Sequence, residues 1–329
     1  MKIPLLLLIL LMPACLCTGS VELSLAEVWQ TICGQAAPES AARFIVIESR
    51  LPQMLTALLA GMALAGSGLV MQTLFGNPLA DPSLLGVNSG ASLGAAIALL
   101  TLGGSWAIGS ATLSGVLLTI GAAFAGACMV IVLLMGCSHY LRGNLSLLVA
   151  GVMLSFAISA IISLLSFYAT AEGVRSFVVW GLGDFSGVPL NRLPLLALLV
   201  VIPALLLLTL SHPLNALLLG PEYATNLGVR VRRVRTRLLL ITGLLTASVT
   251  ALCGPVSFIG LAVPHIARLL LHTADHRKLL PATLVLGADV ALLSLLLTHL
   301  PGSRGTLPLA AITPLMGVPV VLYILIRRR

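Results

Sequence analysis

The sequence predicts an all-α protein that crosses a membrane about ten times. Of the 329 residues, 59% are hydrophobic and only 9% are charged, and the mean hydropathy is +1.12. A soluble domain carries about a quarter charged residues, so a water-soluble fold is excluded. The net charge of +8 does not point to nucleic acid, because the basic residues gather in a few short loops, as they do beside membrane spans. No polar stretch is long enough to fold alone, so residues 1–329 are predicted to form one transmembrane domain.

The stretch from Arg50 to Gly94 organises the rest of the chain. Its first half, Met54 to Met71, contains no charge and is long enough to cross a bilayer as a helix. Small residues within it allow another helix backbone to approach closely: Gly61, Ala65, Gly66 and Gly68. The segment ends in a polar turn, Gly76-Asn77-Pro78, before a second apolar segment begins. Irregular backbone at this depth must be packed in protein or line a cavity.

The first 20 residues hold one lysine followed by an apolar run. They are interpreted as a first span, oriented by the lysine on the cytoplasmic side. A cleaved signal peptide, or a lipoprotein signal through Cys15 or Cys17, is the alternative. Residues 21–49 mix polar and apolar side chains and predict an external loop with a short amphipathic helix.

Hydropathy predicts nine further spans, at about 52–74, 86–103, 107–136, 145–169, 192–211, 236–253, 255–272, 280–300 and 308–326. An even number of spans puts both termini on one side. With both termini inside, only five of the 18 Lys and Arg residues face out: Arg43, Arg50, Arg175, Arg192 and Arg304. The positive-inside rule therefore predicts that both termini are cytoplasmic.

Several kinds of chemistry are missing from the sequence. A phosphate-binding P-loop ends in Gly-Lys, but the only lysines, Lys2 and Lys278, do not follow a glycine. The six cysteines form no C-x-x-C pair and are interpreted as buried small hydrophobes. We therefore predict no catalytic residue, cofactor or bound metal. Asp289 is the clearest acid within a span, and either a proton-carrying role or a helix-helix hydrogen bond would explain it.

The loop from Pro213 to Arg237 predicts a short helix at about 221–227. Gly220 and Pro221 suit the start of a helix, and Glu222 complements the helix dipole in the first turn. Gly228 suits its end. Such a projecting helix can fit a cleft in a soluble partner, but an ordinary interfacial loop with positive-inside arginines explains the pattern equally well.

Two other groups of polar residues stand out. Residues 265–278 hold three histidines, an aspartate and three basic residues. A metal site is conceivable there, but a solvated cytoplasmic turn with local ion pairs is favoured, and His265 is expected to be packed or to cap a helix. Arg50 and Arg304 lie at outer span ends, where they could contact an acidic partner or lipid headgroups.

Together these places resemble the FecCD-type permeases, the membrane subunits of ABC importers for iron-siderophores, haem and cobalamin. The similar stretches lie between residues 50 and 328: RLPQMLTALLAGMALAGSGLVMQTLFGNPLADPSLLGVNSGASLG, VVWGLGDFSG, GPEYATNLGV, FIGLAVPHIARLLLHTADHRKLLP and GTLPLAAITPLMGVPVVLYILIRR.

The resemblance implies a cobalamin-importer-like, type II ABC importer permease in a bacterial inner membrane. It implies a homodimer, two cytoplasmic ATP-binding subunits and an external solute-binding protein. By the same resemblance, the ATPase-coupling loop corresponds to Gly220, Glu222, Ala224 and Gly228. Docking of the solute-binding protein corresponds to Arg50 and Arg304, and the inner gate of the path to Asn77 and Leu79.

Three positions depart from the family pattern. The family usually has an acid where Thr306 stands, often an aspartate where Leu295 stands, and often a basic residue where Gln53 stands. The function that the resemblance implies is import of an iron chelate, a siderophore or haem, with cobalamin as the alternative. An ion-coupled secondary transporter is the alternative from another class, but it predicts paired intramembrane acids or inverted repeats. A membrane enzyme that uses residues 265–278 is a third.

Overall fold

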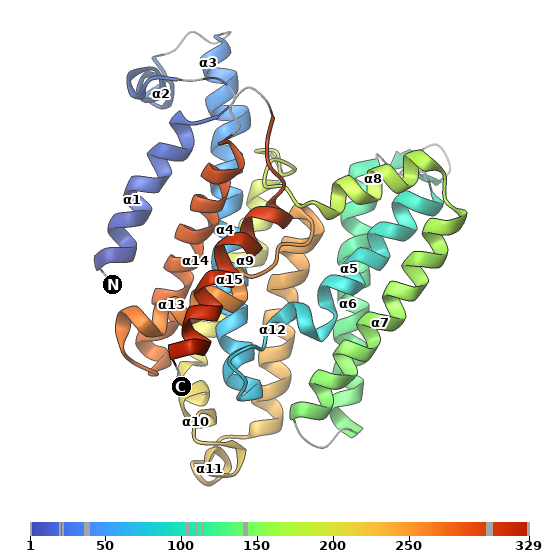
Figure 1. Cartoon of the computed structure of the whole chain (residues 1–329), viewed down its shortest axis with the longest axis vertical. Coiled ribbons are helices and arrows are strands. Elements are labelled where there is room, and N and C mark those ends of the chain that lie inside the picture. The colour runs from blue at the N-terminus through green and yellow to red at the C-terminus, as the bar shows by residue number, and fades with distance from the viewer. Residues whose placement is uncertain are drawn as a thin grey trace.

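The computed structural model describes residues 2–19, 21, 23–35, 40–102, 106–108, 111–113, 115–140, 144–300 and 305–327. Within these residues nearly every element is a helix, and the long helices stand side by side (Figure 1). Helices α2 and α3 lie at one end of the molecule and α11 at the other. We name these the outer end and the inner end, after the orientation that the arginine distribution predicts.

The N-terminal elements begin beside the bundle and then enter its centre. They are α1 (Lys2–Cys17), α2 (Leu25–Ile32), α3 (Ala41–Arg43), the π-helical turn η1 (Phe44–Arg50) and α4 (Leu51–Phe75). The helix expected in the loop at 21–49 is therefore present. Ser24 and Glu27 start α2 with a capping box, since each side chain bonds the backbone N–H of the other residue. α1 lies against α14, where Cys15 Sγ donates to Leu292 O (3.6 Å).

Helix α4 forms the centre of the fold because its glycines let two other helices approach. A Cβ atom on Gly68 would lie 1.8 Å from Gly260 O in α13, and one on Gly61 would lie 2.1 Å from Gly287 O in α14. Both distances are far below van der Waals contact, so only glycine fits. The close helix packing predicted from the small residues of this segment is confirmed.

The middle of the chain forms a second group of helices to one side of α4 (Figure 1). It contains the 3₁₀ turn η2 (Pro82–Leu85), α5 (Val87–Ala96), η3 (Ile97–Thr101), β1 (Trp106–Ile108), β2 (Ala111–Leu113), α6 (Gly115–Tyr140), α7 (Asn144–Tyr168) and α8 (Ala171–Gly181). The span predicted at 107–136 is wrong at its start, because β1 and β2 pair as an antiparallel hairpin before α6 begins. Short apolar runs beside glycines suit a strand as well as a helix.

The C-terminal half returns to α4 and packs on its other faces. It contains α9 (Leu193–Thr209), α10 (Ser211–Leu217), α11 (Pro221–Asn226), α12 (Val231–Cys253), α13 (Ile259–Leu271), α14 (His276–Thr298) and α15 (Leu309–Arg327). The predicted boundary between the spans at 236–253 and 255–272 is confirmed. α12 ends at Gly254, whose φ of 73° ends the helix, and α13 begins after Phe258.

The helices of the described residues include fewer long spans than expected. Five are long and apolar enough to cross a membrane, and the pair α9 and α10, bent by 58°, makes a sixth. Four shorter apolar helices cover Ile3–Cys17, Val87–Thr101, Ile259–Leu271 and Leu309–Tyr323. Helix length therefore supports five or six spans and does not establish the ten expected, because breaks in the backbone keep the other apolar segments short.

Candidate functional site

The docking helix predicted at 221–227 is α11, which lies at the inner tip of the molecule (Figure 1). Gly220 precedes it with φ 99° and ψ 157°, a conformation that suits glycine, and Pro221 opens its first turn. Glu222 and Tyr223 are exposed, whereas Ala224 is fully buried. Gly228 (φ 82°) ends the helix, and Val229 N donates to Ala224 O (2.9 Å). One buried alanine thus anchors a helix whose other side chains project outward.

A row of arginines follows α11 at the start of α12. Arg230, Arg232, Arg233 and Arg237 are exposed, and Arg235 is partly buried. Arg232, Arg233, Thr236 and Arg237 line a shallow recess. No ion pair involving these arginines is found among the described residues, so the inner tip carries a concentrated positive charge.

The broken connection after α4 is held by specific hydrogen bonds. Gly76 turns the chain with φ 59°. Asn77 Oδ1 accepts from Leu79 N (2.9 Å), and Asn77 N donates to Gln72 O (3.2 Å). Leu79, at the tip of the turn, is 40% exposed. His265 Nε2 lies 2.9 Å from Pro78 O, which confirms that this histidine is packed and fixes the connection against α13.

The cluster at 265–278 is the solvated turn that the sequence favoured only in part, because His272, Arg277 and Lys278 are exposed but other members are buried. His276 is only 1% exposed. Its Nε2 atom lies 2.8 Å from Thr73 Oγ1, and its Nδ1 atom lies 2.8 Å from Asn215 Oδ1. Asn215 Nδ2 donates to Asp275 Oδ1 (2.6 Å). Hydrogen bonds from the backbone N–H of Arg277 and from the Asn215 amide lower the pKa of Asp275.

A second set of hydrogen bonds joins α4 to α13 through Gln72, the residue before Thr73. Arg268 Nη1 donates to Gln72 Oε1 (2.6 Å), and Gln72 Nε2 donates to Leu261 O (3.2 Å). The polar residues of this stretch therefore bind one another and the ends of helices. Within the described ranges, no three His, Cys, Asp or Glu side chains are grouped closely enough to hold a metal ion.

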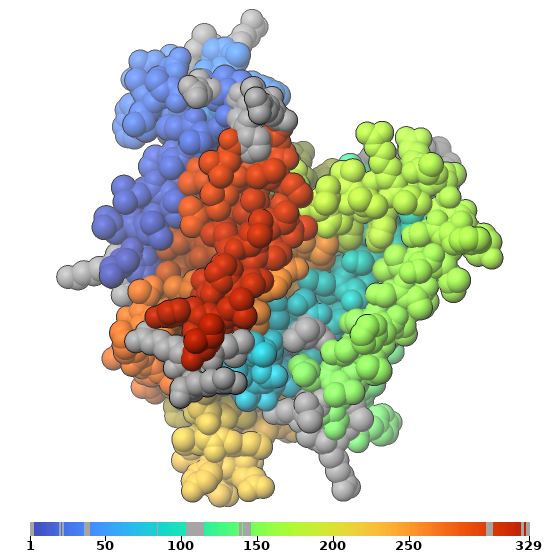
Figure 2. All heavy atoms as spheres, in the orientation of Figure 1, coloured from blue at the N-terminus to red at the C-terminus, as the bar shows by residue number. Residues whose placement is uncertain are grey.

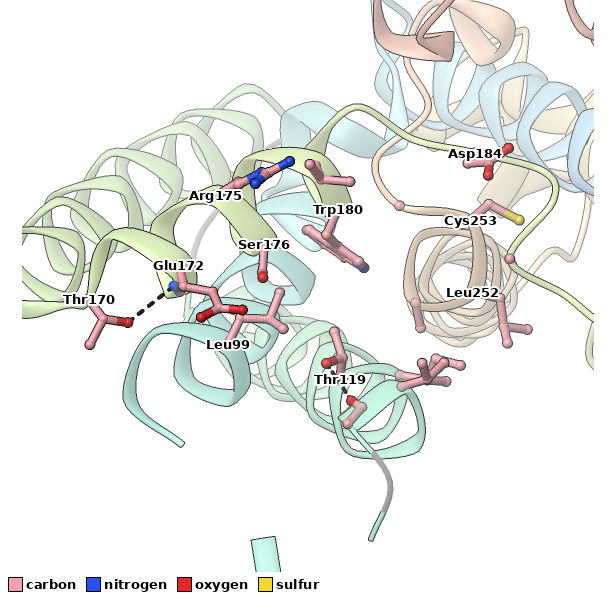
Figure 3. A pocket seen from close by; sticks show the side chains of 18 of the residues that line it. Leu99, Thr119, Thr170, Glu172, Arg175, Ser176, Trp180, Asp184, Leu252 and Cys253 are labelled. Carbon is pink, nitrogen blue, oxygen red and sulfur yellow. Dashed lines mark hydrogen bonds between the residues drawn. The ribbon is translucent and has the colours of Figure 1, made fainter. Parts of the chain in front are cut away.

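Two cavities open at the outer end. The larger, about 1250 Å³, lies between α6, α8 and the end of α12. Figure 3 shows Glu172, Arg175 and Trp180 on α8 on one side of it, with Cys253 and Asp184 across from them. The smaller, about 270 Å³, is lined by Gln53, Leu295 and Thr306 among other residues. These are the three positions at which the chain departs from the family pattern, and the structure brings them together.

The structure describes one of the two arginines expected at the outer end. Arg304 lies outside the described residues. Arg50 is 5% exposed, and its guanidinium donates to Leu16 O (2.7 Å), Cys17 O (2.8 Å) and Val21 O. It therefore ties the end of α1 to the start of α4. An external partner could reach this guanidinium only if those carbonyl groups moved away.

Asp289 lies in the middle of α14 and is 1% exposed. Neither carboxylate oxygen has a hydrogen-bond partner among the described residues. Within the part of the chain that the structure describes, the helix-helix hydrogen bond that would have explained this acid is therefore not found.

Comparison with known proteins identifies the family. The FecCD transport family matches residues 6–327. The chain belongs to this family. It is 36% identical over 328 residues to a vitamin B12 import system permease of Klebsiella pneumoniae, covering 98% of this chain and 92% of the relative. It is 33% identical over 312 residues to a hemin transport system permease of Yersinia pestis, covering 94% and 90%.

A solved structure agrees with this FecCD assignment. It is described as an inward-facing conformation of a metal-chelate type ABC transporter, and it matches with a TM-score of 0.85 and 29% identity. The match covers 99% of this chain and 98% of that one. The chain is thus a multi-pass ABC importer permease, and ATP-binding subunits and a binding protein are its expected partners.

Sequence reasoning missed three residues of this FecCD permease that the structure places at the inner end. Gln72 and Thr73 lie within the Arg50–Gly94 stretch, and Asn215 lies within the Pro213–Arg237 loop, but no role was predicted for any of them. The one available signal was that each is a polar residue near the end of an apolar helix. A buried polar group needs a partner, so such residues could have been expected to meet.

Proposed function

We propose that two copies of this chain form the membrane path of an ABC importer that carries a metal chelate into a bacterial cell. The match to the FecCD family over residues 6–327 carries this proposal. The chelate is an iron complex, haem or a siderophore, and cobalamin is the alternative. The relatives named above are permeases for vitamin B12 and for hemin, and both ligands are metal complexes of large ring systems.

Coupling to ATP is assigned to the inner tip. α11 projects, Ala224 anchors it, and Gly220 and Gly228 allow its two sharp turns. Glu222 lies in its first turn, where a soluble ATP-binding subunit would meet it. ATP binding would change the distance between the α11 helices of the two copies and tilt their bundles. Asn77 and Leu79, in the broken connection, would form the inner gate.

The second copy is assigned to the face that carries α7. This helix is the least buried of the long spans, with 17% of its most apolar window buried. Figure 2 shows it at the edge of the molecule. Its exposed side chains include Met153, Phe156, Leu164 and Phe167. Such an apolar face can meet a second copy in the membrane, and the larger outer cavity opens on the same side of the bundle.

The remaining details complete the proposal. The four shorter apolar helices, together with the six longer segments, make ten spans, with both termini cytoplasmic in the inner membrane. Arg50 and Arg304 would contact the solute-binding protein outside, with Arg50 released from its carbonyl partners on docking.

Reconstitution tests this function. The chain, its ATP-binding subunit and its binding protein are placed in proteoliposomes, and uptake of haem, a ferric siderophore and cobalamin is measured separately. Uptake of one chelate that requires ATP and the binding protein is expected. Uptake that persists without ATP would exclude an ABC importer, and preferential uptake of cobalamin would replace the iron chelate as substrate.

A further inference from the structure

The helix that leads into α11 is bonded to the bundle through one side chain. Asn215 lies on α10, ahead of the turn that begins α11. Its Nδ2 atom donates to Asp275 Oδ1 (2.6 Å), and its Oδ1 atom accepts from His276 N (2.8 Å). These two bonds connect α10 to the first residues of α14.

The same two bonds fix how His276 is protonated. The bond from His276 N identifies Asn215 Oδ1 as a hydrogen-bond acceptor. The same oxygen lies 2.8 Å from His276 Nδ1, so Nδ1 must be the donor and carries a proton. The other ring nitrogen, Nε2, meets the Thr73 hydroxyl at 2.8 Å near the end of α4. Asn215 therefore orients the ring that joins α14 to α4.

From Thr73 the contacts continue to the broken connection. The neighbouring Gln72 is held by Arg268 (2.6 Å), and Gln72 O accepts from Asn77 N (3.2 Å). His265, on the same helix as Arg268, lies 2.9 Å from Pro78 O. Hydrogen bonds thus join α10 to His276 and Thr73. The residue before Thr73, Gln72, is bonded to Asn77 N, and a separate contact from His265 holds Pro78.

The alternative route from α11, through α12, offers fewer side-chain hydrogen bonds that could pass on a movement. α11 buries only Ala224, so movement of α11 must pass mainly through the chain on either side of it. On the α12 side, Val229 and Val231 pack against the core, but the arginines beside them are exposed. The two buried guanidinium nitrogens of Arg235 have no partner among the described residues. On the α10 side, Asn215 is bonded to two residues of another helix.

We propose that Asn215 transmits movement of α11 to the inner gate, through His276 and Thr73 to the Asn77–Leu79 turn. This inference rests on the proposed function, because it requires an ATP-binding subunit at α11. It makes Asn215 a positioning residue that touches neither ATP nor substrate.

We call this path, from Asn215 through His276 and Thr73 to the Asn77–Leu79 turn, the relay. An exchange of the Asn215 and Asp275 side chains tests it. Asn215→Asp places a carboxylate where the Asn215 amide now donates to Asp275, so the two negative groups repel. Asp275→Asn, combined with it, restores a donor and an acceptor at this contact. Asparagine also caps helices as well as aspartate does, so the start of α14 is kept. Asn191→Asp, on an exposed turn at the outer end, is the matched control.

The measurements are made on the permease reconstituted with its ATP-binding subunit and binding protein. Asn215→Asp is expected to lower ATP-driven uptake by about 10-fold or more, within the usual range of coupling between sites. Subunit binding and ATP hydrolysis should be retained. The double variant should recover uptake, and Asn191→Asp should match the unaltered protein.

A second measurement follows the movement itself. Spin labels are placed at exposed Asn226 and at Leu79, with Cys17, Cys33, Cys128 and Cys137 replaced by serine. In the labelled protein that keeps Asn215, ATP should change the signals of both labels. With Asn215→Asp, the Asn226 label should still respond while the Leu79 label no longer does.

Three results would overturn the relay: normal uptake with Asn215→Asp, loss of subunit binding in step with uptake, or no recovery in the double variant. Each of these leaves ATP-driven uptake by the unaltered protein intact. Failure of the proposed function is different, because the unaltered chain would then bind no ATP-binding subunit, and the relay would fall with it.

Discussion

The two ends of this permease are held together in different ways. At the inner end, side chains of α4, α10, α13 and α14 bond to one another over separations of up to 203 residues in the chain. At the outer end, Arg50 bonds to backbone carbonyl groups near the end of α1. The smaller outer cavity is lined mostly by uncharged side chains, among them Gln53, Leu295 and Thr306, with Asp184 and His299 also in its wall.

This difference affects how movement passes between helices. Side-chain bonds between helices have defined directions, so movement of one helix is passed to the next. Around the smaller outer cavity, the hydrogen bonds of the described polar side chains stay within one helix or loop, so they impose fewer such constraints. The inner end is therefore expected to respond strongly to single substitutions, and the outer end mainly where Arg50 is removed.

The largest effect is expected at the turn into α11. Gly220→Val forces a β-branched residue into φ 99°, a region that costs about 1–3 kcal/mol for residues other than glycine. No atom lies within 4 Å of the added Cβ, so the strain acts on the orientation of α11 alone. Binding of the ATP-binding subunit should weaken about 10- to 100-fold, measured by titration in detergent.

Gly121→Ala is the control for this substitution. Gly121 lies inside α6, and a Cβ there also meets nothing within 4 Å. Alanine favours a helix over glycine, so binding and stability should be unchanged or slightly improved. Equal effects of both substitutions would show that the geometry of Gly220 has no special role.

The next effect is expected at the outer end. Arg50→Gln removes a charged donor from three carbonyl groups, and hydrogen bonds to charged groups contribute about 1.5–3 kcal/mol each. The temperature of unfolding should fall, and protease should cut the α1–α2 connection sooner. Weaker docking of the binding protein with unchanged stability would instead support the docking role proposed for Arg50.

A matched pair of threonines compares the two ends directly. Thr73→Val leaves the buried His276 Nε2 without its partner, which should destabilise the fold by about 1–3 kcal/mol. Thr298, at the outer end of α14, donates to Leu295 O within its own helix, so Thr298→Val should cost much less. Thermal unfolding of both variants in the same detergent checks this, and equal losses would remove the distinction between the ends.

The features that were predicted best are those that residues close together in the sequence determine. α11 was placed within one residue because glycine and proline at its ends have strong local preferences, and the close packing of α4 followed from its glycines. The strands at 106–113 were missed, because a short apolar run suits either structure. The bonds of Asn215 and His276 could not be predicted, since 61 residues separate them and helical periodicity does not encode contacts between distant helix ends.

Asp289 offers the smallest expected effect and separates two classes of transporter. Its buried carboxylate has no hydrogen-bond partner among the described residues, and an acid within a membrane is a natural candidate for carrying protons. In an ATP-driven importer that role is absent. Asp289→Asn keeps the size of the side chain and should change uptake by no more than about 2-fold, since a single proton carrier without titratable partners makes a poor relay. Uptake should also persist when the proton gradient is dissipated, whereas loss of uptake under either condition would favour an ion-coupled transporter and contradict the ATP-driven mechanism.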